Sequence, residues 1–103
     1  MSIFNLAIST GCHRGSAEDF FKAGDAKRAK GDMEGAIADY CRAIELDPRA
    51  AAAYCNRGIA KKAKDDSEGA IADYNRAIEL DPKDATAYYN RGIAKKGSSG
   101  ISG

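Results

Sequence analysis

The chain repeats itself at a period of 34 residues. The 28 residues that begin at Gly35 recur, with five changes, from Gly69 onward. A fixed period of this length is typical of stacked helical hairpins, because a single hairpin can bury its apolar face only against its neighbours. The sequence therefore predicts an all-α stack of antiparallel helix hairpins, an architecture that presents an extended concave surface for binding.

Apolar and small residues at helical spacing predict where the helices lie. Gly31 is expected to end the first helix in the left-handed conformation, and Asp32 to cap the start of the next one. Pro48 and Pro82 end the second and fourth helices, because proline disfavours helical geometry in the residue before it. The predicted helices span 17–30, 33–46, 51–64, 67–80 and 85–96.

Small residues are expected to let paired helices approach each other closely. We expect Gly24 to lie against Ala36, and the same contact to recur in the second unit. The turn that follows the third helix differs from the first turn, because Asp65 stands where the first unit has Gly31. An aspartate adopts positive φ with less ease than a glycine.

The repeat divides the chain into three parts. Residues 1–16 lie outside the repeat and are expected to form a flexible leader. The Gly/Ser-rich residues 97–103 are expected to form a flexible tail. Between them lies the repeat domain, predicted as a full repeat, a second full repeat and one further helix, at 17–50, 51–84 and 85–96.

Composition argues against two classes of partner. Sixteen basic and 15 acidic residues leave a formal net charge of +1, which provides no global field for nucleic acid or an anionic membrane. No apolar run approaches the roughly 20 residues that a membrane-spanning helix needs. The three cysteines are an odd number without metal or redox spacing, which favours free thiols in a reducing compartment such as the cytoplasm.

The chain lacks residues suited to catalysis, so we expect no enzyme activity and no cofactor. The single histidine, His13, lies in the predicted leader, where a Cys–His or Ser–His pair would have no rigid platform. Carboxylates repeat on the second helix of each unit, which predicts a convex, solvated position for them. These carboxylates are Asp39, Asp73, Glu45 and Glu79.

A zinc site built from the cysteines is also not expected. Cys12 and His13 are adjacent on an irregular segment, which is poor geometry for a metal that prefers four well-placed ligands. Cys41 and Cys55 replace an asparagine and a tyrosine of the next unit. We therefore interpret these two as ordinary thiols on helix surfaces.

An aromatic residue, a glycine four residues later, and then an alanine, an aromatic, an alanine and a proline recur at one spacing. The series is Phe20, Gly24, Ala36, Tyr40, Ala43 and Pro48, and again Tyr54, Gly58, Ala70, Tyr74, Ala77 and Pro82. It resembles the signature of the tetratricopeptide repeat (TPR) family over residues 17–96, and a third unit begins at Tyr88. The resemblance implies a right-handed superhelical stack that binds proteins.

Small or charged residues stand where the family often has a large apolar residue just before the glycine and an aromatic residue three positions after it. The residues before it are Ala23, Arg57 and Arg91, and those three positions after it are Lys27, Lys61 and Lys95. A thinner core than is usual for the family is therefore expected.

By this resemblance, the first helix of each unit lines a groove for a partner peptide. Asn56 and Asn90 would hold the backbone of an extended peptide, because an amide side chain both donates and accepts hydrogen bonds. Arg28, Lys62 and Lys96 would align along one edge and favour an acidic peptide. The alternative is a polar, solvated face. The predicted groove residues are Phe21, Asp25, Arg28, Asn56, Ile59, Lys62, Tyr89, Asn90, Ile93 and Lys96.

One subgroup of the family, the carboxylate-clamp TPRs, grips the acidic C-terminal tails of chaperones. The matching positions here hold Phe21, Asp25, Asn56, Thr86 and Asn90, of which only Asn56 fits. Asp25 would repel a carboxylate. Binding of chaperone tails in that manner is therefore not expected.

Self-assembly is the alternative function. Repeat arrays generally need about three units and a polar capping helix. The last predicted helix bears Tyr88, Tyr89 and Ile93, and no partner helix is predicted after it. Such an end could form a homo-oligomer by pairing with a second copy, or pack against the leader. A fragment of a longer array would have the same features.

Overall fold

The computed structural model describes residues 16–98. The rest of the predicted leader, and residues 99–103 of the predicted tail, lie outside the described residues. The five helices are α2 (Ala17–Ala29), α3 (Met33–Leu46), α4 (Ala51–Ala63), α5 (Ser67–Leu80) and α6 (Ala85–Ser98).

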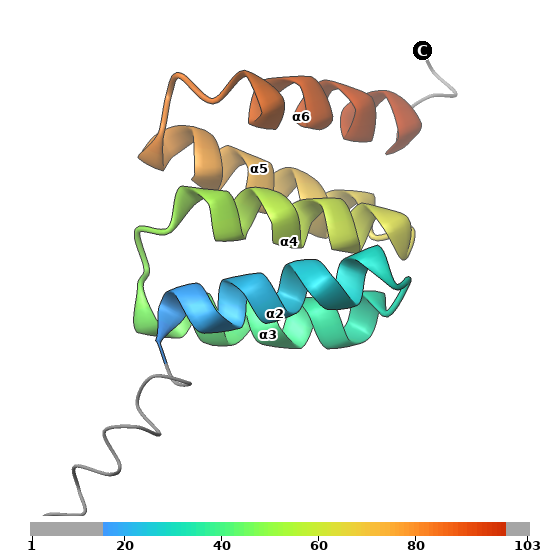
Figure 1. Ribbon diagram of the computed structural model, residues 1–103. Helices are drawn as coiled ribbons and strands as arrows, with labels where there is room; N and C mark the ends of the chain where they lie inside the picture. The colour runs from blue at the N-terminus through green and yellow to red at the C-terminus, as the bar shows by residue number, and fades with distance from the viewer. Residues whose placement is uncertain (1–15, 99–103) are drawn as a thin grey trace, which may run out of the picture.

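The helices form a stack of antiparallel hairpins, as Figure 1 shows. Each helix packs against the next in sequence, and α4 also contacts both α2 and α6. The helices α2, α4 and α6 therefore form one layer, which we call the first-helix layer, while α3 and α5 cover its other side. Four of the described helices follow the predicted range within one residue, whereas α6 also includes Gly97 and Ser98, which were predicted to belong to the tail.

Side-chain caps begin most of these helices. Ser16 Oγ accepts a hydrogen bond from the Asp19 N–H at 3.1 Å. Asp32 caps α3 by accepting from the Gly35 N–H at 2.9 Å, as predicted. Asp66 caps α5 in the same way, since it occupies the same place in the second unit. Each cap satisfies a backbone N–H that has no partner within its helix.

Both hairpin turns use the left-handed conformation that was predicted for the first. Gly31 has φ +89°, and Asp65 has φ +66°. Glycine adopts this region without strain, whereas an aspartate pays a steric cost from its Cβ. We expect Asp65→Gly to raise the free energy of unfolding by up to about 1 kcal/mol, since glycine removes the steric cost of a Cβ at positive φ. Urea titrations of the parent chain, Asp65→Gly and Gly31→Ala test this expectation. Gly31→Ala should lower the free energy of unfolding, and a lower value for Asp65→Gly than for the parent would contradict the expectation.

The start of α4 lacks the side-chain cap that is present at the equivalent start of α6. Ala50 makes no capping hydrogen bond. At the same place before α6, Asp84 Oδ1 accepts from the Ala87 N–H at 3.2 Å. We expect Ala50→Asp to stabilise the protein by about 1 kcal/mol and Asp84→Ala to destabilise it by a similar amount. Thermal melts of both variants check this pair, and equal melting temperatures for Ala50→Asp and the parent would contradict it.

Tyrosine rings seated on glycines hold each hairpin together. Tyr40 is fully buried and Tyr74 is 2% exposed. A Cβ built on Gly24 would lie 2.7 Å from Tyr40 Cε1, and one on Gly58 would lie 2.6 Å from Tyr74 Cε1. The glycines therefore make room for a ring of the second helix, whereas the sequence suggested an alanine contact. Cys55 and eight alanines make up the rest of the buried core: Ala36, Ala43, Ala53, Ala60, Ala70, Ala77, Ala87 and Ala94.

The prediction that all four repeated carboxylates are solvated was wrong for two of them. Glu45 and Glu79 are exposed, but Asp39 and Asp73 are 7% and 4% exposed. They are buried because each stands three residues after one buried alanine and four before the next, which places it on the helix face that meets the first helix.

Cations of the first helix meet these two buried carboxylates. Arg57 holds Asp73 with two hydrogen bonds, from Nε at 2.8 Å and Nη2 at 2.7 Å, and Lys61 Nζ lies 3.2 Å from the same side chain. In the first hairpin, Lys27 Nζ lies 2.9 Å from Asp39 Oδ2, as an ion pair without hydrogen-bond alignment. The charged residues beside the glycines thus form ion pairs inside the hairpins, in place of apolar contacts.

Candidate functional site

All ten predicted groove residues belong to helices of the first-helix layer, but their exposure is unequal. Phe21, Ile59 and Asn90 are half-buried, and Phe21 and Ile59 pack against the two core clusters. Tyr89 is 70% exposed and Ile93 is 44% exposed. The structure therefore brings residues of α2 and α4 together, while the predicted apolar contacts of α6 stand open.

A polar cluster joins the first two repeats around Asp25. Tyr40 donates its hydroxyl hydrogen to Asp25 Oδ1. Asn56 Nδ2 donates to the same oxygen at 2.9 Å, across 31 residues of chain. Arg28 Nη2 lies 3.6 Å from Asp25 Oδ1, and its Nε donates to the Tyr40 hydroxyl at 3.2 Å. Asn56 is thus already engaged by the chain itself, and only its remaining N–H and its carbonyl stay available to a ligand.

This cluster changes the acid–base behaviour of its members. Burial raises the pKa of Tyr40 to about 12, and the hydrogen bond to Asp25 adds to that rise, although Arg28 opposes it. The hydrogen bond to Tyr40 raises the pKa of Arg28, against its partial burial. Arg28 therefore stays a cation, but Asp25 offsets its charge.

The interface between α4 and α6 carries no such cluster, because Ile59 of α4 stands at the position equivalent to Asp25 of α2. Cys55 occupies the place of Phe21 and is 4% exposed, so it is a buried thiol and the prediction of a surface thiol was wrong for it. Burial raises the pKa of Cys55, as does the charge of Asp84, while Asn90 and Arg28 lower it. Cys41 is half-buried and lies 3.3 Å from Arg57 Nη1.

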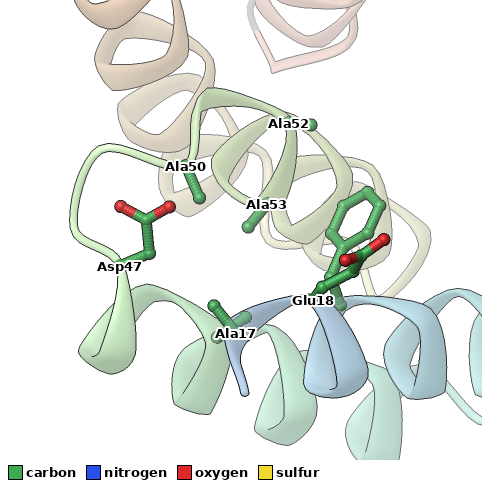
Figure 2. Close-up of a pocket in the computed structure, with 8 residues that line it drawn as sticks. Ala17, Glu18, Asp47, Ala50, Ala52 and Ala53 are labelled. Carbon is green, nitrogen blue, oxygen red and sulfur yellow. The ribbon is translucent and has the colours of Figure 1, made fainter.

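An open apolar pocket lies where α2 meets the start of α4 (Figure 2). Its volume is about 210 Å³, which is below the roughly 300–1,000 Å³ of typical small-molecule sites. It therefore suits a single side chain better than a cofactor. Its lining residues are Ala17, Glu18, Phe21, Ala43, Asp47, Ala50, Ala52 and Ala53.

The sequence prediction included Phe21 but missed the pocket itself. The available signal was the run of four alanines that begins at Ala50, which leaves open space opposite a large aromatic ring. In the second unit, Asp84, Thr86 and Cys55 replace Ala50, Ala52 and Phe21. The two interfaces therefore differ in chemistry despite the repeat.

The basic residues predicted along one edge differ in their partners. Arg28 is held by Asp25 and Tyr40, as described above. Lys62 is half-buried and Lys96 is exposed, and neither forms an ion pair within residues 16–98. An attraction for acidic groups therefore rests on Lys62 and Lys96, at the far end of α4 and α6 from the pocket.

Among the described residues, no three histidine, cysteine or acidic side chains gather in a way that could hold a metal ion. Cys12 and His13 lie outside the described residues. Within the same part of the chain, no helix is both long and apolar enough to cross a membrane.

Solved structures with the same architecture are similar to this chain. The crystal structure of MamA has a TM-score of 0.80 and 29% sequence identity, over 82% of this chain and 50% of MamA. The second TPR of Spaghetti (RPAP3), bound to the HSP90 peptide SRMEEVD, has a TM-score of 0.81 and 26% identity, over 91% of this chain and 87% of that one. This chain thus spans about half the length of MamA.

The first TPR of the same protein, bound to the same peptide, has a TM-score of 0.75 and 26% identity, over 77% of this chain and 64% of that one. A search of curated proteins found no match. The profile of the TPR repeat matches residues 24–65 and 60–97. Because these two matches cover most of the chain, and the described helices have the architecture of the similar structures, the chain belongs to the tetratricopeptide repeat family.

Proposed function

We propose that this chain is a non-catalytic protein-interaction module that captures an extended peptide in a groove along the first-helix layer. The pocket of about 210 Å³ between α2 and α4 carries the proposal, because it is apolar, open and sized for one side chain. The similarity to two peptide-bound TPR structures supports the same mode of binding. The free thiols of Cys41 and Cys55 favour a reducing compartment such as the cytoplasm.

The charges beside the pocket indicate which peptide fits. Glu18 and Asp47 line the pocket and make a carboxylate unfavourable there, whereas Lys62 lies at the other end of α4. Ten residues of helix separate Ala52 from Lys62, which is about 15 Å. An extended peptide covers that distance in about five residues. The proposed ligand therefore has a large apolar residue in the pocket and an acidic residue about five positions away.

Filling the pocket tests this proposal. We expect Ala52→Phe to weaken peptide binding by roughly tenfold or more, because the new ring occupies the space of the ligand's apolar side chain. Ala72→Phe is the matched control, since Ala72 is exposed on α5 and adds the same ring outside the first-helix layer. The measurement is enrichment from a library of random peptides, followed by fluorescence anisotropy of the selected sequences.

A second variant addresses the polar groups. Asn56→Ala combined with Asn90→Ala should abolish binding of the selected peptides while circular dichroism shows unchanged helicity. Unchanged affinity in this double variant and in Ala52→Phe would exclude the groove. Selection of peptides that lack an apolar residue would exclude the pocket.

A further inference from the structure

Helix α6 carries the same receiving face as α4, and no helix of the described residues covers this face in α6. Over their first twelve residues the two helices differ at two positions, 52/86 and 55/89. Position 52 is exposed on α4, whereas Cys55, which shares a core cluster with Tyr74, borders the face with which α4 holds α5. That face consists of Tyr54, Arg57, Gly58 and Lys61, and its counterpart in α6, which we call the α6 socket, consists of Tyr88, Arg91, Gly92 and Lys95.

The seat for an aromatic ring is vacant in the α6 socket. At Gly58 of α4, an added Cβ would collide with the ring of Tyr74, but at Gly92 it would meet no atom of the described residues within 4 Å. Gly92 is exposed, and Tyr88 beside it is 44% exposed. Figure 1 shows why, since α6 is the last described helix of the stack and only α5 and α4 pack against it.

The arginine of the socket is already held in the required pose. Arg91 lies over the ring of Tyr88 at 5.3 Å, as Arg57 lies over the ring of Tyr54 at 5.5 Å. Its Nη1 donates to Asn75 Oδ1 at 2.8 Å, at the place where Arg57 Nη1 contacts Cys41.

What Arg91 lacks is a carboxylate. In Arg57, Nε and Nη2 bind Asp73, which is supplied by the helix that covers α4. Arg91 forms no ion pair with any residue in the range 16–98. A partner that brings an acidic side chain to this point would therefore satisfy two donors that are already positioned.

We propose that the α6 socket receives one amphipathic helix of a partner polypeptide that carries the pattern Ala-X-X-Asp-Tyr. This is the pattern with which α3 and α5 cover α2 and α4, at 36–40 and 70–74. The tyrosine ring seats on Gly92, the aspartate pairs with Arg91, and the alanine permits close approach of the two helices.

The chain cannot supply this helix from its own folded copies. The pattern occurs twice in the 103 residues, and both tyrosines are buried within their own hairpins. A second folded copy would have to unfold a hairpin to present either segment. The occupant therefore comes from outside these 103 residues, and association of two intact copies does not fill the socket.

A peptide with the sequence of residues 66–83 is a direct probe, because it contains the pattern in its native helix. We expect this peptide, labelled with a fluorophore, to bind the full chain in an anisotropy titration. Gly92→Ala should weaken binding by roughly tenfold or more, since a Cβ there would meet the incoming ring as it would at Gly58. This variant does not endanger the fold, because Gly92 is an exposed helix residue and alanine is the better helix former.

Charge reversal gives an independent check. A peptide with lysine in place of the aspartate should bind Arg91→Glu better than it binds the parent chain. Ala52→Phe, which fills the pocket between α2 and α4, should leave binding of the helix unchanged. Equal affinity of the parent chain and Gly92→Ala for the peptide, or no binding at all, would overturn the proposal. Light scattering that shows a dimer abolished by Gly92→Ala would overturn it as well, because a second copy would then be the occupant.

Discussion

Asp73→Ala is expected to lower the free energy of unfolding by about 3 kcal/mol, because it leaves two cations without their carboxylate inside a hairpin. The side chains of Arg57 and Lys61 are 17% and 24% exposed, so water can replace only part of the lost interaction. Arg57 also loses two hydrogen bonds shorter than 3 Å. Lys61 can turn its ammonium group toward water, which keeps the cost near the lower end of the range for broken buried pairs.

The first hairpin provides a matched control for this prediction. Asp39 occupies the same position as Asp73, but its one partner, Lys27, has a side chain that is 44% exposed. Asp39→Ala should therefore cost about 1 kcal/mol, because Lys27 returns to water with little loss. Urea unfolding of the two variants measures the difference. Equal destabilisation by Asp39→Ala and Asp73→Ala would show that the arginine pair contributes nothing beyond the burial of the carboxylate.

The same ion pairs show where prediction from the sequence stopped. The repeat indicated that the cations beside Gly24 and Gly58 stand where the family commonly has apolar residues. It also indicated that Asp39 recurs as Asp73, sixteen residues after Arg57. Each set was interpreted alone, the first as a thin core and the second as solvated surface. A hairpin brings the cations and the acids together as ion pairs. The sequence signal for these pairs was that the number of cations beside the glycine rises from one in the first unit to two in the second.

The fold itself was predictable because the two units are nearly identical. A helix boundary that is ambiguous in one unit is repeated in the other, and the caps Asp32 and Asp66 occupy the same place in each. The left-handed turn was predicted at Gly31 alone, and Asp65 adopts the same conformation in the second unit. Local hydrogen bonds and sterics decide these features, and such interactions can be read from a few neighbouring residues.

The contacts between units were not predictable in this way. The hydrogen bond from Asn56 to Asp25 spans one repeat, and it depends on how far and how steeply the second hairpin is displaced from the first. The pocket depends on the same displacement, together with the missing side chains of Ala50 and Ala52. A periodic sequence indicates which residues share a face, but it does not indicate which of them already satisfy each other.

A loss of stability above pH 10 is the second large effect that we expect. Burial raises the pKa of Tyr74 to about 12, with further contributions from Cys55 and Asp73, and Tyr40 has a similarly raised value. In the unfolded chain these hydroxyls ionise near pH 10, so above that pH the unfolded state binds fewer protons than the folded state. Stability is therefore complete below pH 10 and falls as the pH rises toward 12. Two pKa units on a buried group correspond to about 2–3 kcal/mol for each tyrosine.

Phenylalanine variants separate this effect from the general titration of lysines. Tyr74→Phe keeps the ring on Gly58 but removes the ionisable group, so its free energy of unfolding should fall less steeply than that of the parent between pH 10 and 12. Tyr40→Phe should show the same shallower slope from a lower starting stability, because the hydroxyl of Tyr40 bonds both Asp25 and Arg28. Urea titrations across this pH range, followed by tyrosinate absorbance, measure both slopes. A parent and a Tyr74→Phe variant with the same slope would mean that the buried hydroxyl reaches water in the folded state and that the two hairpins open more readily than their packing indicates.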